Sequence, residues 1–409
     1  MTENFGSRDG QRDDKTGLSP FADMIEATRL TGLGRLEEAT ALIQRSLAGQ
    51  RAAPAEHAST DSSPHHADPS AMPQIPAAES GTRMREVVGQ VVRGLAPVLK
   101  GLGNPLRHPA PPPADRGGGT GGRFVALTHA EPAGTREYKL FIPSHPDAAA
   151  PLIVMLHGCT QNPDDFAAGT GMNTLAERAG VFVAYPAQSR QAHAQRCWNW
   201  YEPRDQGRGT GEPAIIAGLA RAIMAEHPID RARVYIAGLS AGGAAALNIA
   251  RAYPDLFAAV GVHSGLAAGC ARDLGSALMA MQVGAPGLGT ATAFGSPAPA
   301  TRVPTIIFHG EDDGTVSVRN ADQVLAQAHV AGLIARSETF EGRGHPFTRT
   351  RYRDEAGRVV VEDWRVRGAG HAWSGGRPDG SYTDPEGPDA SRAMLDFFAE
   401  HRLGPARRP

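Results

Sequence analysis

Cysteine and tryptophan are scarce in this sequence of 409 residues, and no apolar run approaches the length needed to cross a bilayer. The three cysteines cannot build a multi-disulfide framework, and their spacing matches no zinc-site signature, so we expect neither metal nor cofactor. A net charge of −2 excludes strong electrostatic attraction to nucleic acid or to anionic membranes. The polar residues 1–10 lack the apolar stretch of a secretory signal, which favours a cytoplasmic protein.

Apolar residues make up 41% of the chain, enough for a substantial core. From Arg123 onward, strand-like and helix-like stretches alternate, which predicts an α/β fold with a mostly parallel sheet covered by helices on both faces. We expect strands at 123–130, 137–143, 151–157, 181–186, 233–239, 258–263 and 304–309, helices at 170–179, 212–227, 241–253, 318–331 and 388–401, and a hairpin over 346–367.

The composition divides the chain into three parts. Residues 1–50 contain two amphipathic stretches, 20–29 and 34–44, which predict short helices. Residues 51–122 have the Pro-, Ala- and Gly-rich composition of a largely disordered linker, in which 85–99 is either an apolar helix or part of the linker. Residues 123–405 form the expected catalytic domain. Within it, the Ala-, Gly- and Pro-rich stretch 270–301 is interpreted as a cap over the site or as a surface loop.

Ser240 lies in Gly238-Leu-Ser-Ala-Gly242, between a strand-like run and an alanine-rich helix. This G-x-S-x-G pattern in that context is typical of a nucleophile elbow, in which a strained turn exposes a reactive serine. The flanking glycines are required because a side chain there would collide with neighbouring backbone. The sequence therefore predicts a serine nucleophile.

An elbow serine needs an orienting acid and a base, which follow it in that order along the chain. Three carboxylates follow the apolar run ending at His309, and we choose Asp313, with Asp312 as the alternative. The expected base is His371, flanked by small residues on a late loop, and His345 is its rival. His263 ends another strand, where it is expected to line the pocket.

The oxyanion hole is expected to use two backbone N–H groups. One belongs to Ala241, directly after the nucleophile, and the other to Cys159 in the loop that follows the strand at 151–157, with Thr160 as the alternative.

Five segments together resemble the esterase/poly(3-hydroxybutyrate) depolymerase family of α/β-hydrolases, which is related to feruloyl and acetylxylan esterases. They are Leu156-His-Gly-Cys-Thr-Gln161, Cys197-Trp-Asn-Trp200, Gly211-Glu-Pro213, Gly238-Leu-Ser-Ala-Gly-Gly243 and Gly370-His-Ala-Trp-Ser-Gly375. The resemblance implies hydrolysis of carboxylic esters with Ser240, Asp313 and His371 as the triad. The expected substrates are hydroxyalkanoate polyesters or their oligomers, the alternative being feruloyl or acetyl esters of carbohydrates.

Other expectations depend on these motifs. Trp198, Trp200 and Trp373 are expected to bind the acyl chain, with Thr160 and Gln161 beside them, although any of the rings could instead pack in the core. Cys159 and Cys197 are either bridged or a pair of buried thiols. Secreted members of the family make an extracellular location the alternative to the cytoplasm. Residues 1–100 could contact polyester granules or a protein, and a non-catalytic granule-binding module is the remaining alternative function.

Overall fold

In the computed structural model, residues 121–285 and 302–404 are described. The helices expected at 20–29, 34–44 and 85–99, nearly all of the predicted linker, and residues 286–301 of the expected cap lie outside these ranges. None of the helices in the described ranges is long and apolar enough to cross a membrane.

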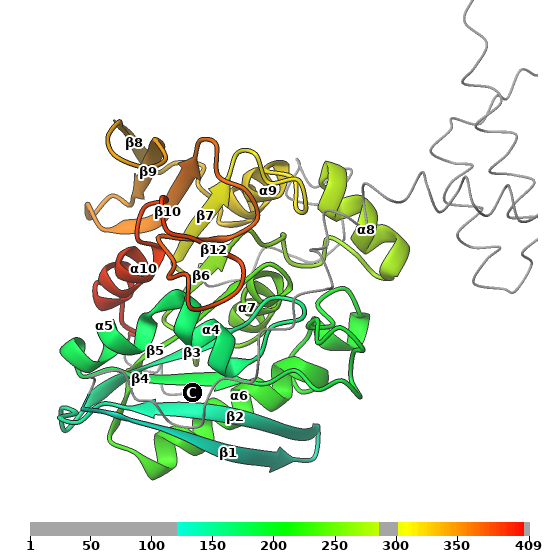
Figure 1. The fold of residues 1–409 in the computed structure, drawn as a ribbon, viewed down its shortest axis with the longest axis vertical. Helices are drawn as coiled ribbons and strands as arrows, with labels where there is room; N and C mark the ends of the chain where they lie inside the picture. Colours follow the sequence, from blue (N-terminus) through cyan, green and yellow to red (C-terminus); the bar gives the residue numbers. More distant parts are fainter. Residues whose placement is uncertain (1–120, 286–301, 405–409) are drawn as a thin grey trace, which may run out of the picture. The chain divides into compact units, whose positions relative to one another are not determined.

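A ten-stranded sheet forms the centre of the described fold (Figure 1). Its strands are β1 (Arg123–Glu131), β2 (Gly134–Ile142), β3 (Ala150–Leu156), β4 (Phe182–Pro186), β5 (Ile229–Leu239), β6 (Ala259–His263), β7 (Thr305–Gly310), β8 (Ile334–Phe340), β9 (Phe347–Arg353) and β10 (Val359–Val366). The order is β1-β2-β4-β3-β5-β6-β7-β10-β9-β8. The strands from β4 to β10 in this order pair in parallel, whereas β1–β2–β4 and β10–β9–β8 pair antiparallel. A two-stranded pair, β11 (Trp373–Ser374) with β12 (Thr383–Asp384), lies apart from this sheet.

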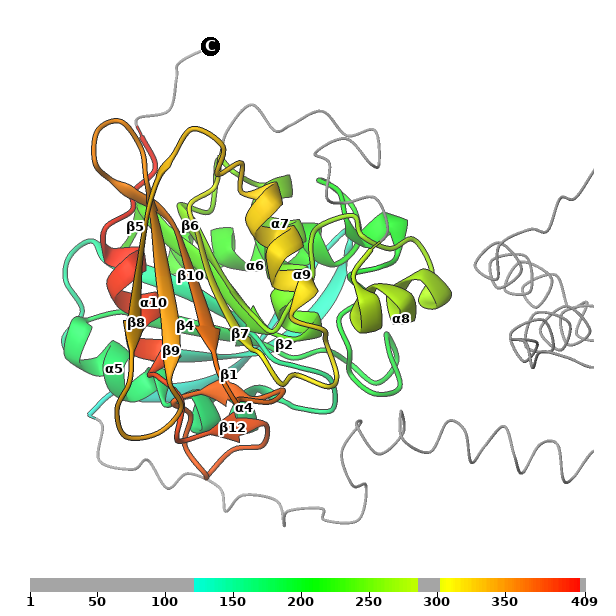
Figure 2. The ribbon, with the colours of Figure 1, turned by 90° about the horizontal axis from the view of Figure 1, so that it is seen from above.

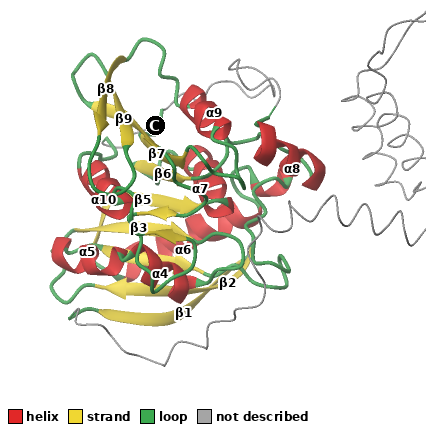
Figure 3. Cartoon of the chain, turned by 45° about the horizontal axis from the view of Figure 1, so that its top comes forward, coloured by secondary structure: helices red, strands yellow, loops and turns green. Residues whose placement is uncertain are grey.

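Helices cover both faces of the sheet (Figures 2 and 3). One face packs against α4 (Pro163–Thr170), α5 (Met172–Ala179) and α10 (Ala390–Ala399). The other packs against α6 (Gly211–Glu226), α7 (Ala241–Ala252) and α9 (Arg319–Gln327), with α8 (Leu274–Val283) beside α9. A single turn of 3₁₀ helix, Pro203–Asp205, precedes α6.

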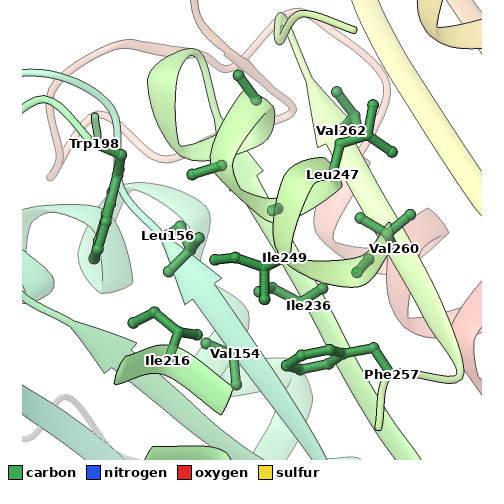
Figure 4. Close-up of a cluster of buried hydrophobic side chains, with 14 of the residues drawn as sticks. Val154, Leu156, Trp198, Ile216, Ile236, Leu247, Ile249, Phe257, Val260 and Val262 are labelled. Atoms are coloured by element: carbon green, nitrogen blue, oxygen red, sulfur yellow. The ribbon is translucent and has the colours of Figure 1, made fainter. Parts of the chain in front are cut away.

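The strands place alternate side chains in two separate cores. Val154 of β3 belongs to a cluster with Ile216 of α6 and Ile249 of α7 (Figure 4). Its neighbour Ile153 points to the opposite face and packs in the cluster that contains Phe166 of α4. Because successive strand residues face opposite sides, a strand buried on both faces must be apolar throughout, which is why the central strands read as continuous apolar runs.

The α/β-hydrolase fold class predicted from the sequence is confirmed, and all seven expected strands are present. The expected hairpin at 346–367 is formed by β9 and β10. The sequence prediction missed α4, α8 and β8, and the helix expected at 318–331 ends at Gln327. α4 was missed because Gly171, with φ +61°, ends it immediately before α5 begins, so that only the second helix was recognised.

Candidate active site

Ser240 lies between β5 and α7 with φ +58° and ψ −122°, a backbone conformation rarely adopted by residues other than glycine. A Cβ atom on Gly238 would lie 2.4 Å from the carbonyl carbon of Gly242, and one on Gly242 would lie 2.2 Å from the oxygen of Leu156. Both glycines are therefore required by close backbone packing. The turn holds the serine at the carboxyl end of a central parallel strand, the usual place for a reacting group in an open α/β sheet.

This packing makes a stability prediction. Gly242→Ala should lower the free energy of unfolding by about 1–3 kcal/mol, because the new methyl group forces the strand end and the helix apart. The control is Gly207→Ala, where no atom lies within 4 Å of the added Cβ. It should change stability by less than about 0.5 kcal/mol. Equal midpoints for the two variants in urea unfolding would contradict the packing argument.

Asp313 and His371 come from loops after β7 and β10 and meet at the carboxyl end of the sheet. His371 Nδ1 lies 2.7 Å from Asp313 Oδ2. The other carboxylate oxygen, Oδ1, accepts hydrogen bonds from the N–H groups of Thr315 (2.9 Å) and Val316 (2.8 Å). His371 donates through Nδ1, so Nε2 is left as its basic nitrogen.

The Asp313 side chain is buried and yet held in the charged form. Burial alone would raise the pKa of Asp313, but hydrogen bonds from His309 and His371 lower it well below its usual range. His309 Nε2 lies 3.5 Å from Asp313 Oδ2 and donates to the carbonyl of Val316 at 2.8 Å, so it also fixes the acid loop. A carboxylate that stays ionised is what an imidazole needs when it becomes an imidazolium.

The two alternatives left open by the sequence lie elsewhere. Asp312 is exposed, and its N–H donates to the carbonyl of Ala369 at 3.1 Å. His345 Nε2 lies 3.2 Å from a different carboxylate, that of Asp384. The geometry thus pairs His371 with Asp313.

The sequence predicts that His263 lines the pocket, and in the structure its side chain is buried beside the elbow. Its Nε2 accepts the N–H of Ser374 at 2.9 Å, while its carbonyl accepts the N–H of Ser240 at 2.9 Å. The ring stacks on Trp373 with centroids 4.9 Å apart. Burial, together with the charges of the neighbouring His309 and His371, lowers the pKa of His263 to about 3. A neutral His263 therefore joins the elbow to the loop that carries His371.

The loop of residues 158–161, here called the oxyanion loop, follows β3. Gly158 donates its N–H to Gln161 Oε1 at 2.8 Å, and Thr160 donates its N–H to the carbonyl of Gln195 at 2.6 Å. Thr160 is therefore not a free oxyanion donor. Within the described ranges, the N–H groups of Cys159 and Ala241 donate no hydrogen bond, which leaves both available to a substrate oxygen.

Cys159 and Cys197 form a disulfide, with Cα atoms 4.2 Å apart. Of the two alternatives posed by the sequence, the structure has the bridge and not a pair of thiols. The third cysteine, Cys270, is free and buried. The bridge ties the oxyanion loop to the segment that carries Trp198 and Trp200.

The three tryptophans of the motifs do not form an exposed acyl-binding surface. Trp198 is fully buried and its Nε1 donates to the carbonyl of His157 at 3.0 Å. Trp373 is 1% exposed and its Nε1 donates to Ser391 Oγ at 3.0 Å. Trp200 is also buried. Large flat rings bury most area when both faces are covered, and here Trp198 bonds to the residue before the loop after β3 while Trp373 bonds to α10.

Among the expected binding residues, Gln161 is also buried, and its Nε2 donates to the carbonyl of Ser381 at 3.0 Å. Thr160 remains exposed, and its Oγ1 lies 3.3 Å from the hydroxyl of Tyr382. Tyr382 was missed because it stands alone in a polar stretch, and only the fold brings it beside Thr160. In the described part of the chain, no cluster of three or more His, Cys, Asp or Glu side chains is arranged to hold a metal ion.

Comparison with known proteins agrees with this architecture. Poly(3-hydroxyalkanoate) depolymerase C of Paucimonas lemoignei is 32% identical over 260 residues, which cover 60% of this chain and 61% of that protein. Feruloyl esterase B of Thermothelomyces thermophilus is 32% identical over 211 residues, covering 49% of this chain and 72% of that protein. The solved structure of an acetyl xylan esterase from Aspergillus awamori superimposes with a TM-score of 0.55 at 19% identity, covering 68% of this chain and all of that chain, which shows a common fold.

The chain spans less than two thirds of the length of the depolymerase relative. Its residues 136–342, about half of the chain, match the family described as Esterase PHB depolymerase. With the serine elbow and the paired acid and histidine on an α/β-hydrolase sheet, this match shows that the chain belongs to the Esterase PHB depolymerase family.

Proposed function

We propose that this chain is a serine esterase that hydrolyses carboxylic esters through an acyl-enzyme on Ser240. The observation that carries the proposal is the hydrogen bond of 2.7 Å between His371 and the buried Asp313, in a fold whose central strand ends in a serine elbow. This arrangement supplies the orienting acid and the base that an elbow serine needs.

In the proposed mechanism, Ser240 Oγ attacks the ester carbonyl carbon while His371 Nε2 accepts the hydroxyl proton. Asp313 stabilises the imidazolium, and the N–H groups of Cys159 and Ala241 stabilise the oxyanion. Collapse of the tetrahedral intermediate breaks the carbon–oxygen bond, and His371 returns its proton to the departing alcohol. Water then attacks the acyl-enzyme with His371 as base, which releases the acid and restores Ser240.

We propose hydroxyalkanoate polyesters or their oligomers as substrates, supported by the similarity to a poly(3-hydroxyalkanoate) depolymerase. A feruloyl or acetyl ester of a carbohydrate is the second candidate, supported by the similarity to feruloyl esterase B. A panel of hydroxybutyrate oligomers, feruloylated sugars, acetylated xylan and short p-nitrophenyl esters separates them. Highest kcat/KM for the oligomers supports the first proposal, and highest kcat/KM for either carbohydrate ester replaces it with the second.

A non-catalytic granule-binding module is the contrasting function. Covalent labelling by a fluorophosphonate at Ser240, read by mass spectrometry, would be expected of the esterase and not of the module. Labelling at another serine, or none in folded protein, would contradict the proposed nucleophile.

The role of Asp313 makes a graded prediction. Asp313→Asn should lower kcat by about 10⁴-fold, because the amide leaves His371 without its orienting carboxylate and favours the wrong tautomer. Asp312→Asn is the matched control on the same loop and should stay within about threefold of wild type, since the Asp312 side chain is exposed. Similar losses in both variants would mean that loop geometry, and not the Asp313 carboxylate, is being measured.

A further inference from the structure

We infer that Glu212, in the first turn of α6, is a positioning residue for the oxyanion loop and acts through residues 195–199. This inference rests on the proposed esterase function. Glu212 lies in the Gly211-Glu-Pro213 motif, to which the sequence assigned no chemical role. It is buried, and we place it away from the reacting atoms.

The first step is that the oxyanion loop is fastened to residues 195–197. The Thr160 N–H donates to the carbonyl of Gln195 at 2.6 Å, and the disulfide joins Cys159 to Cys197. The disulfide is formed by Cys159 itself, whose N–H is the proposed oxyanion donor, and the hydrogen bond is made by the next residue, Thr160. The direction of the Cys159 N–H therefore depends on where residues 195–197 are held.

The second step is that Glu212 holds that segment. Its Oε2 accepts the backbone N–H of Asn199 at 2.9 Å, and its Oε1 accepts the Asn199 side chain at 3.1 Å. Gln188 Nε2 also donates to Oε1, and the same nitrogen donates to the carbonyl of Cys197 at 2.9 Å. The Glu212 carboxylate thus holds the segment before Trp198, where Gln188 links it to Cys197, and after Trp198, where it accepts from Asn199.

The third step is that only a carboxylate fits this position. The Glu212 side-chain oxygens are contacted by donors: the Asn199 N–H and the Asn199 and Gln188 side-chain amides at hydrogen-bond distance, and the Arg136 guanidinium as an ion pair at 3.9 Å. An ionised carboxylate accepts from the three amide groups and attracts the guanidinium, whereas an amide would direct its own N–H groups against these donors. A buried donor left without an acceptor costs about 1–3 kcal/mol, so the segment would shift to recover its hydrogen bonds.

Arg136 offsets part of the free-energy cost of burying the Glu212 charge. Burial and the nearby Asp205 carboxylate raise the pKa of Glu212 to about 7, and Arg136 acts in the opposite direction. Arg136 is itself buried, donates to Gln188 Oε1 at 2.5 Å, and lies over the Trp198 ring at 5.6 Å. The network therefore connects β2, α6 and the tryptophan segment to the oxyanion loop.

The test is Glu212→Gln in the full-length chain, assayed with p-nitrophenyl butyrate at about pH 8.5, where wild-type Glu212 is ionised. Rates are divided by the number of active sites, counted by complete fluorophosphonate labelling. We expect kcat to fall about tenfold or more with KM within about twofold of wild type, because oxyanion donors act mainly in the transition state. Glu226→Gln is the matched control, since Glu226 is exposed at the end of the same helix, and it should keep the wild-type kcat.

The outcomes are distinguishable. A wild-type protein that hydrolyses no ester would overturn the proposed function itself. An active wild type with an unchanged kcat per site in Glu212→Gln, or a change in KM alone, would overturn only the positioning role. If Glu212→Gln fails to fold, Asn199→Ala removes one side-chain donor and keeps the backbone bond. It should lower kcat by about two- to fivefold, and an unchanged kcat would again overturn the inference.

Discussion

Replacement of Ser240 by alanine is expected to abolish ester hydrolysis, with kcat reduced by about 10⁴-fold or more, because the nucleophilic oxygen is removed and the other triad members have nothing to activate. The fold should be retained. Alanine occupies the same φ of +58° as serine at equal cost, and the hydrogen bond from the residue-240 N–H to His263 does not involve the side chain. Initial rates on p-nitrophenyl butyrate, with thermal unfolding measured in parallel, test this expectation.

Ser337→Ala is the matched control for Ser240→Ala. Ser337 lies on the exposed edge strand β8, where its hydroxyl contacts Thr350 Oγ1 at 2.9 Å, and its loss should leave kcat unchanged. If folded Ser240→Ala retains more than about one per cent of the wild-type rate, another residue is the nucleophile.

The second large effect is expected for His371→Ala. Without the imidazole, Ser240 has no base to accept its proton and the leaving alcohol has no acid, so kcat should fall by about 10⁴-fold or more. Asp313 would remain buried without one of its two histidine partners, and some loss of stability should accompany the loss of activity. The measurements are kcat on a soluble ester and the unfolding midpoint.

His345→Ala separates a catalytic histidine from a structural one. His345 pairs with Asp384 and not with Asp313, so this variant should keep kcat within a few-fold of wild type. A large loss in His345→Ala with little loss in His371→Ala would reverse the assignment of the base.

Much of this architecture was readable from the sequence because it is local. Central strands are apolar throughout, and the elbow has its glycines within two residues of Ser240, where backbone packing demands them. The pairing of Asp313 with His371 was a choice among candidates, since these two residues lie 58 positions apart in the sequence and are brought together only because β7 and β10 lie side by side. Strand β8 was missed because all seven of its residues are exposed, so it has no alternation of buried and exposed positions.

Side-chain direction was the part that the sequence could not supply. Motif position suggested that Trp198, Trp373 and His263 face the substrate, but each is buried and uses a ring nitrogen to bond a segment distant in the sequence. Whether an aromatic residue beside a reactive group lines the pocket or supports it depends on what lies behind it. That is decided by elements distant in the sequence, and the same holds for Glu212, whose hydrogen-bond and ion-pair partners come from three separate segments.

The burial of the tryptophans has a practical consequence for spectroscopy. The chain has four tryptophans, and all of them, Trp198, Trp200, Trp364 and Trp373, are buried in the described domain. Residues 1–120 contain none. Indole emission shifts to longer wavelength when water reaches the ring, so this shift in the full-length chain would follow unfolding of the hydrolase fold with no contribution from the N-terminal residues. Trp373 lies two residues after the proposed base, His371, and its ring stacks on His263. Part of that fluorescence signal therefore originates beside the active site itself.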